Sequence, residues 1–146
     1  MIKANTFNGR RVAVFGLGRT GVSAALSLQA GGAAVLAWDD RDDARDAASA
    51  EGVEIHDLSL IDWSTIDEFV LSPGVPHDRP KPHWTAVAAI AASVPIICDI
   101  EIFAREINAC PASDRPKVIA ITGTNGKSTT TSLIGHILKT LGKDAQ

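Results

Sequence analysis

The sequence has few cysteines, no long hydrophobic run and no excess of positive charge. Its 146 residues include two cysteines, Cys98 and Cys110, without CxxC spacing or a companion histidine cluster. We therefore expect reduced thiols, with Cys98 buried at a strand end, and no metal site built on them. No apolar run reaches the ~18 residues of a membrane span, and the first residues lack a signal-peptide core, which favours a cytoplasmic protein. The net charge of −3 argues against a nucleic-acid partner, which usually needs a basic surface.

The composition supports a packed α/β domain. Apolar residues make up 45% of the chain and charged residues 21%, which allows a hydrophobic core and argues against a wholly disordered chain. The length fits one domain, or one domain plus a piece of another. Short apolar runs alternate with helical patterns, as expected of a Rossmann-like parallel sheet with flanking helices.

The first glycine-rich loop lies in a strand–loop–helix–strand unit. A strand predicted at residues 11–15 leads into G-x-G-x-x-G at residues 16–21, followed by a helix at 22–29 and a strand at 34–38. Asp39 then comes close to the ~20-residue spacing of a dinucleotide-binding unit. The motif alone is a weak signal, and this context strengthens it.

The loop suits contact with an anion. Gly16 makes the turn, Gly18 lets a phosphate approach the backbone, and Gly21 lets the helix pack closely on the strand. Thr20 adds a hydroxyl donor. The alternative is that the glycines serve only packing.

Polar residues at neighbouring strand ends extend this candidate site. Asp39 can accept hydrogen bonds from a ribose or a base, and Arg41 can pair with a phosphate or stack on a ring. After a strand at residues 68–71, Ser72 and Gly74 form a turn at the edge where open α/β sheets bind ligands. The alternatives are that Asp39 only caps the next helix and that Arg41 is an ordinary surface arginine.

Further elements extend the expected sheet to about five strands. The patterns predict helices at residues 42–50, 84–92 and 100–107, and strands at residues 53–55 and 94–97. Asp99 is expected to cap the last helix, which has a predicted apolar face of Ile100, Phe103, Ala104 and Ile107. Leu60, Ile61 and Trp63 should be packing residues. His77 and His83 should be exposed loop histidines.

A linker and a second glycine-rich loop follow. Residues 108–116 have linker-like composition, which divides the chain into domains at residues 1–107 and 117–146. An apolar run at residues 118–121, predicted to be a strand, precedes G-x-x-G-K-S at residues 123–128 and a helix to about residue 141. The usual phosphate loop is longer and would place glycine where Ile121 stands.

This second loop is suited to holding a triphosphate. Its glycines turn backbone N–H groups inward, and the helix N-terminus adds about half a positive charge. Lys127 can reach the outer phosphates, and the Ser128 hydroxyl can bind Mg²⁺. The alternative is a tight turn between a strand and a helix.

With these motifs the chain resembles the Mur ligases of bacterial cell-wall synthesis over essentially its whole length. The likeness rests on residues 16–21, 39–41, 72–74, 99–103 and 122–129, and the short phosphate loop is the family's own form. The resemblance is to members that add D-glutamate to UDP-N-acetylmuramoyl-L-alanine. Folylpolyglutamate synthases share Gly-Thr-Asn-Gly-Lys but typically continue with Gly-Ser, where this chain has Ser128 and Thr129, and they lack the N-terminal loop domain.

The resemblance implies a domain that binds the UDP of the substrate, followed by the start of an ATPase domain. In this family ATP phosphorylates the substrate carboxylate, and the amine of D-glutamate displaces phosphate from the acyl phosphate. The positions that match the UDP site are Gly18, Arg19, Thr20, Asp39, Arg41, Ser72 and Gly74. Those that match the ATP loop are Gly123, Thr124, Asn125, Gly126, Lys127, Ser128 and Thr129, with Lys127 as the catalytic residue and Ser128 as the Mg²⁺ ligand.

The same resemblance predicts that other active-site residues lie beyond Gln146, so we expect an N-terminal fragment without ligase activity of its own. An unpaired strand at residues 118–122 would pack on the first domain or pair with another copy of the fragment. Two alternatives differ in function: an NAD(P)-dependent oxidoreductase, inferred from the first loop alone, and a nucleotide-binding module without catalysis.

Overall fold

Short apolar runs form a parallel four-stranded sheet in the first of the chain's two units. The strands are β1 (Arg11–Phe15), β2 (Ala34–Trp38), β3 (Glu68–Leu71) and β4 (Ile96–Ile97). Their order in the sheet is β2-β1-β3-β4, and every pair is parallel. The chain therefore crosses from one side of β1 to the other after β2, as in a Rossmann-like sheet.

The structure is a computed structural model that describes residues 2–79 and 81–143. The first unit comprises residues 1–115 and the second residues 116–146.

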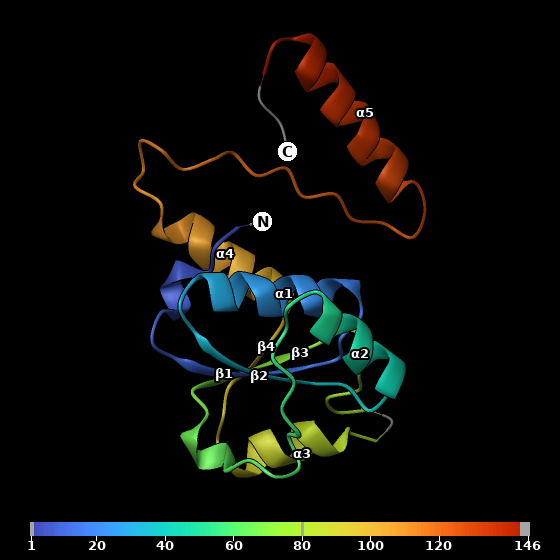
Figure 1. Ribbon diagram of the computed structural model, residues 1–146. Helices are drawn as coiled ribbons and strands as arrows, with labels where there is room; N and C mark the ends of the chain where they lie inside the picture. The colour runs from blue at the N-terminus through green and yellow to red at the C-terminus, as the bar shows by residue number, and fades with distance from the viewer. Residues whose placement is uncertain (1, 80, 144–146) are drawn as a thin grey trace. The chain divides into compact units, whose positions relative to one another are not determined.

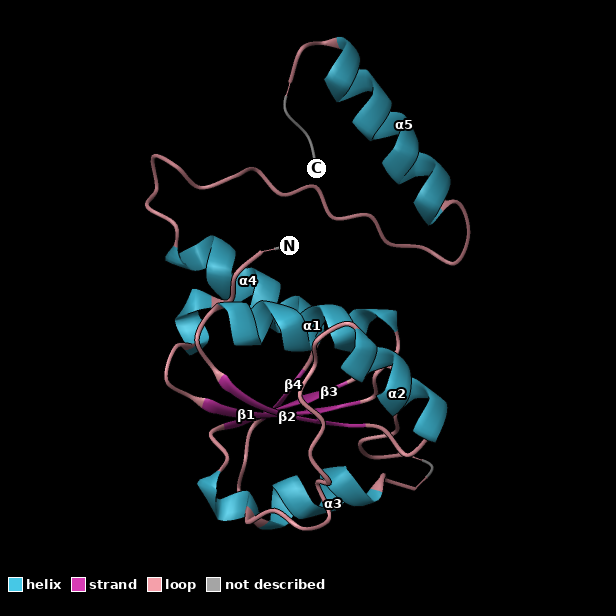
Figure 2. Cartoon of the chain, viewed as in Figure 1, coloured by secondary structure: helices cyan, strands magenta, loops and turns pink. Residues whose placement is uncertain are grey.

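Helices cover both faces of the sheet (Figures 1 and 2). One face carries α1 (Arg19–Ala30), α2 (Asp42–Ala50) and α4 (Asp99–Ala109), and the other carries α3 (Trp84–Ala91). Short 3₁₀ turns lie at Asn5–Phe7 and Trp63–Thr65.

Alternate residues of β1 point into two separate hydrophobic clusters. Val12 and Val14 belong to the cluster under α1, α2 and α4, whereas Ala13 and Phe15 belong to the cluster under α3. All four are at most 4% exposed. This period of two places β1 at the centre of the fold, with its carboxyl end fixed from both sides.

The sheet has four strands where about five were predicted. The strand expected at residues 53–55 is reduced to a single bridge between Ala37 and Ile55, and the strand expected at 94–97 is shortened to Ile96–Ile97. Both lie at the outer edges, where only one neighbour is present to pair with the backbone.

Three predictions, two at the start of α4 and one in the loop before β3, were wrong. Cys98 is exposed, because it is the N-cap of α4 and not part of a strand. Asp99 is the first helical residue, and its carboxylate accepts a hydrogen bond from the N–H of Ile100. Leu60 is 83% exposed, whereas Ile61 and Trp63 pack on the cluster under α3.

The predicted apolar face of α4 was also wrong. Ile100 is 66% exposed and Phe103 36%, whereas Ile102 is buried. Polar contacts orient the helix: Arg105 binds the buried carboxylate of Glu68, and Glu106 accepts hydrogen bonds from Thr6. The prediction considered only the spacing of apolar residues and not these polar contacts, so it placed the buried face of α4 on the opposite side of the helix.

The ion pairs of Glu68 anchor α4 to the amino end of β3. The Glu68 side chain is 4% exposed and is bonded to Arg10 and Arg105, and Arg105 also bonds Glu101 at 2.9 Å. Burial acts to lower the pKa of Arg105, but its hydrogen bonds to Glu101 and Glu68 outweigh burial and raise that pKa. A buried carboxylate with these partners is satisfied in both charge and hydrogen bonds.

In the second unit, residues 116–143 form one helix, α5 (Lys127–Thr140), and the strand predicted before it is absent. Residues 117–123 form no regular structure, so the prediction of a strand at 118–121 was wrong for this chain. Backbone in a strand needs a neighbouring strand for its hydrogen bonds, and the described part of this unit offers none. The hypothesis of self-association through residues 118–122 remains a prediction.

Candidate functional site

The loops that follow β1, β2 and β3 meet at one edge of the sheet. Because the strands are parallel, their carboxyl ends lie together, and β1 stands between β2 and β3. The connection after β1 leads to one side of the sheet and the connection after β3 to the other. Open α/β sheets bind ligands in the crevice at such a point.

Two glycines of the first loop are required by close approach. Gly16 has φ +93°, and a Cβ there would lie 2.6 Å from Oγ of Ser72. A Cβ at Gly21 would lie 1.8 Å from the carbonyl oxygen of Gly16. At Gly18 a Cβ would meet no heavy atom within 4 Å, so the loop is open to solvent on that side. The packing alternative therefore accounts for Gly16 and Gly21 and not for Gly18.

The N-terminus of α1 lies beside this open side. Gly18 is the N-cap and supplies no side-chain cap, and by helix geometry the first N–H groups have no intrahelical partner. Arg19 and Thr20 are exposed on the first turn. They also line a cavity of about 440 Å³ between α1 and α4, which includes Asp99. The free N–H groups at the N-terminus of α1 favour an anion near Gly18, whereas the carboxylates of Asp99 and Glu106 line the cavity.

Asp39 joins the loop after β2 to the glycine loop. One carboxylate oxygen accepts a hydrogen bond from the N–H of Leu17 at 2.7 Å, and the other accepts from the N–H of Arg41 at 3.0 Å. The side chain is 13% exposed. Both oxygens thus have protein partners, and their remaining lone pairs are the ones available to a ligand hydroxyl.

Arg41 and Ser72 differ in how they are held. The Arg41 side chain is 65% exposed, and its Nε lies 3.7 Å from the Asp39 carboxylate. Ser72 donates its hydroxyl hydrogen to the carbonyl of Gly16 at 2.8 Å, so only its lone pairs face a ligand. Gly74 lies in the exposed turn after β3, where a Cβ would meet no heavy atom within 4 Å.

Two residues at this edge were not predicted to matter. Arg45 lies over the indole of Trp38 at 4.2 Å and donates a hydrogen bond to the carbonyl of Asp39 at 2.6 Å. His83 was expected to be an exposed loop residue, but its side chain is only 19% exposed and bonds Asp40. His83 is the N-cap of α3 and its side chain accepts a hydrogen bond from the N–H of Thr85, a role that the usual cap residues Ser, Thr, Asp and Asn would have signalled in the sequence and histidine does not.

The second loop has glycines with positive φ, and the described residues of its unit include no strand. Gly123 has φ +144°, and Gly126, with φ +78°, is the N-cap of α5. Lys127 donates from Nζ to the carbonyl of Gly123. Ser128 and Thr129 are exposed on the first turn of the helix, and Thr124 and Asn125 are exposed in the loop before it.

Ser128 could bind a Mg²⁺ ion for which the protein supplies few of the ligands. Its exposed hydroxyl follows Lys127 at a helix N-terminus, where phosphate oxygens and water would supply the other ligands. Within residues 2–79 and 81–143, no group of three or more His, Cys, Asp or Glu side chains could hold a metal ion. The same residues include no helix that is long and apolar enough to cross a bilayer.

Comparison with known proteins finds relatives that match the whole chain. All of those named here are called UDP-N-acetylmuramoylalanine–D-glutamate ligase. The identity over 146 residues is 56% in Caulobacter sp. strain K31, 58% in Rhizobium etli and 51% in Chelativorans sp. strain BNC1. The match covers 100% of this chain and 31% of each relative, so the chain spans about a third of the length of these relatives. No family model matches the chain.

Proposed function

We propose that the chain carries the substrate-binding part of a peptidoglycan-synthesis enzyme. The premise is that the chain is homologous over its whole length to an N-terminal part of the Mur ligases. The reaction proposed for the whole protein is ATP-dependent addition of D-glutamate to UDP-N-acetylmuramoyl-L-alanine. In our proposal residues 1–107 bind the UDP part of the substrate, and residues 117–146 begin the ATP-binding domain.

The observation that carries the proposal is the meeting of three loops at the carboxyl edge of the sheet. The open side of Gly18 and the first turn of α1, with Arg19 and Thr20, would receive the diphosphate. Asp39 would accept a hydrogen bond from the ribose or the base, and Arg41 would cover the nucleotide from solvent. Ser72 and Gly74 would bound the crevice on the β3 side.

The second loop would hold ATP. The N–H groups from Gly123 to Thr129 would surround the phosphates, and Lys127 would exchange its bond to Gly123 for one to the outer phosphate. Mg²⁺ bound at Ser128 would neutralise charge on the β- and γ-phosphates. Lys127 would stabilise charge as the phosphoryl group moves to the substrate carboxylate, so positioning and electrostatics are its contribution.

Binding of UDP to the purified chain tests the first part. Isothermal titration calorimetry should show binding, and Asp39→Ala should weaken it more than tenfold because the variant loses both a ligand contact and the tie to Leu17. Asp46→Ala, which removes an exposed carboxylate on α2, is the control variant and should bind like the parent. No heat of binding at millimolar UDP would contradict the proposal.

The strand–loop–helix unit around Gly18 also favours a second candidate, an NAD(P)-dependent oxidoreductase. Such a protein would bind NAD more tightly than UDP in the same titration, and it would leave the loop at residues 123–128 without a role. The reverse preference would exclude it. The third alternative is a nucleotide-binding module without catalysis. Such a module would bind UDP, but the whole protein would not consume ATP.

We expect the 146-residue chain by itself to have no ligase activity, because it spans about a third of its relatives' length. Phosphate release from ATP in the presence of UDP-N-acetylmuramoyl-L-alanine and D-glutamate should equal that of the no-protein control. Release above that control would refute this expectation.

A further inference from the structure

His83 connects three segments at the carboxyl edge of the sheet. Its imidazole lies against the ring of Phe15, the last residue of β1, with the ring centroids 4.4 Å apart. Its Nε2 lies 3.0 Å from the carboxylate of Asp40, in the loop after β2. Its backbone is the N-cap of α3, the helix after β3. One residue therefore connects the end of β1, the loop after β2 and the start of α3.

The contacts of the ring assign its hydrogen. Nδ1 accepts from the backbone N–H of Thr85 at 3.4 Å and lies 2.8 Å from the Thr85 hydroxyl, which is fully buried. A nitrogen that accepts from the backbone carries no hydrogen, so the hydrogen is on Nε2. Nε2–H then donates to Asp40, a charge-assisted bond.

We propose that His83 is a positioning residue for nucleotide binding, which holds the loop of residues 39–41 in place through Asp40. The inference rests on the proposed function. Asp40 stands between Asp39, which is tied to Leu17, and Arg41, which has a largely exposed side chain. The bond from His83 fixes the middle of this loop from the α3 side. Binding of a nucleotide then costs less ordering of the loop.

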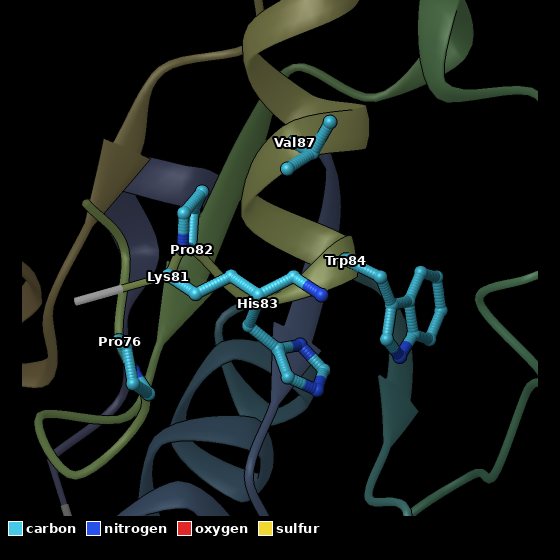
Figure 3. A pocket seen from close by; sticks show the side chains of 6 residues that line it. All are labelled: Pro76, Lys81, Pro82, His83, Trp84 and Val87. Carbon is cyan, nitrogen blue, oxygen red and sulfur yellow. The ribbon is translucent and has the colours of Figure 1, made fainter. Parts of the chain in front are cut away.

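Packing does not replace this bond. His83 lines a cavity of about 550 Å³ together with Lys81, Trp84 and Val87 and two prolines, shown in Figure 3. The cavity leaves space on one side of the ring, and the Asp40 side chain is 55% exposed. The position of Asp40 therefore depends on the hydrogen bond to His83 more than on contact with neighbouring side chains.

The test separates this bond from the role of His83 in capping α3. His83→Asn keeps a side-chain acceptor at the N-cap but is too short to reach Asp40, so the melting temperature should stay near that of the parent. His83→Ala removes the cap as well and should melt at a lower temperature. Asp40→Ala removes the bond from the other side.

Affinity for UDP, measured by calorimetry, gives the decisive comparison. His83→Asn and Asp40→Ala should each weaken binding about three- to tenfold, and the double variant should bind no more weakly than either single variant, because one bond is lost in all three. A purely structural role of His83 would not couple it to Asp40 in UDP affinity.

Two outcomes overturn the inference while the proposed function stands. Either both single variants bind UDP as tightly as a parent that does bind, or the losses multiply in the double variant. Absence of UDP binding by the parent overturns the proposed function itself and this inference with it. If His83→Asn does not fold, Asp40→Ala and Asp40→Asn decide the question: binding equal to that of the parent in both contradicts it.

Discussion

The first glycine-rich loop follows β1, which lies between β2 and β3, whereas the described residues of the second unit include no strand beside the second loop. Gly16 is bonded through its backbone to Trp38 and Ser72, at the ends of β2 and β3. The carbonyl of Gly126 accepts a hydrogen bond from the N–H of Thr130, within its own helix. Both glycines have positive φ, at +93° and +78°.

The difference between the two loops separates conformations set by the local sequence from those that need a partner elsewhere in the chain. Glycine has no Cβ and so allows positive φ wherever it occurs, and both loops contain glycines with positive φ. A strand exists only where another strand pairs with it, so the apolar run at residues 11–15 forms β1 and the run at 118–121 forms none. The same sequence pattern therefore gives a loop packed against neighbouring strands in one unit and an exposed loop in the other.

Amide hydrogen exchange should show the largest contrast. The amides of Val12–Phe15 pair with both neighbouring strands and should exchange at least about a thousandfold more slowly than in an unfolded chain. The amides of residues 118–121 should exchange near the unfolded rate. Comparable protection of the two runs would contradict the difference.

Glycine substitutions should reproduce the contrast in stability. Gly21→Ala places a Cβ 1.8 Å from the Gly16 carbonyl, so it should lower the free energy of unfolding of the first unit by about 3 kcal/mol. Gly126→Ala meets no neighbour, and its cost of about 1 kcal/mol comes from φ alone and is confined to the start of α5. Urea unfolding followed by tryptophan fluorescence reports the first unit, since all three tryptophans lie there, and equal effects would be unexpected.

Hydroxyl deletions should give a smaller effect of the same sign. Ser72→Ala removes the bond to Gly16 and should destabilise the first unit by about 1 kcal/mol. Thr131→Ala removes an exposed bond to the carbonyl of Lys127 and should leave the unfolding transition unchanged. A shift in the second variant as large as in the first would contradict the view that only the first loop is built into a core.

Acid should weaken the turns of the first unit that Asp57 and Asp62 stabilise, and it should leave α5 unchanged. The hydroxyl and then the N–H of Ser59 lower the pKa of Asp57 below 3.8, and Ser64 does the same for Asp62. Because these folded-state pKa values lie below the unfolded ones, the stabilisation is present above the unfolded pKa and is lost as the pH falls through the folded value. The Ser59 and Ser64 amide signals should titrate with midpoints below 3.8 in NMR spectra. Midpoints at or above that value would contradict the assignment.

Much of the first unit follows from the sequence because its central strands are apolar on both faces. β1, β2 and β3 have the predicted bounds, since each is a short buried run. Elements that depend on polar contacts were missed. The orientation of α4 depends on Glu68 and Arg105, which lie far apart in the sequence, and no local pattern links them.

The candidate site shows the same limit. The spacing of Gly16, Gly18 and Gly21 predicted a tight loop, and the structure gives two of these glycines a packing requirement. The contact between His83 and Asp40 joins loops after different strands, so it emerges only once the sheet order is known. Sequence patterns therefore located the loops, and the fold alone brought their side chains together.

A titration of the ¹⁵N-labelled chain with UDP, followed by NMR, tests the central claim most directly. The account predicts shifts of the amides in the loops at residues 16–20, 39–41 and 72–74, and none in residues 123–129. Shifts confined to residues 123–129, or no shifts at millimolar UDP, would contradict it.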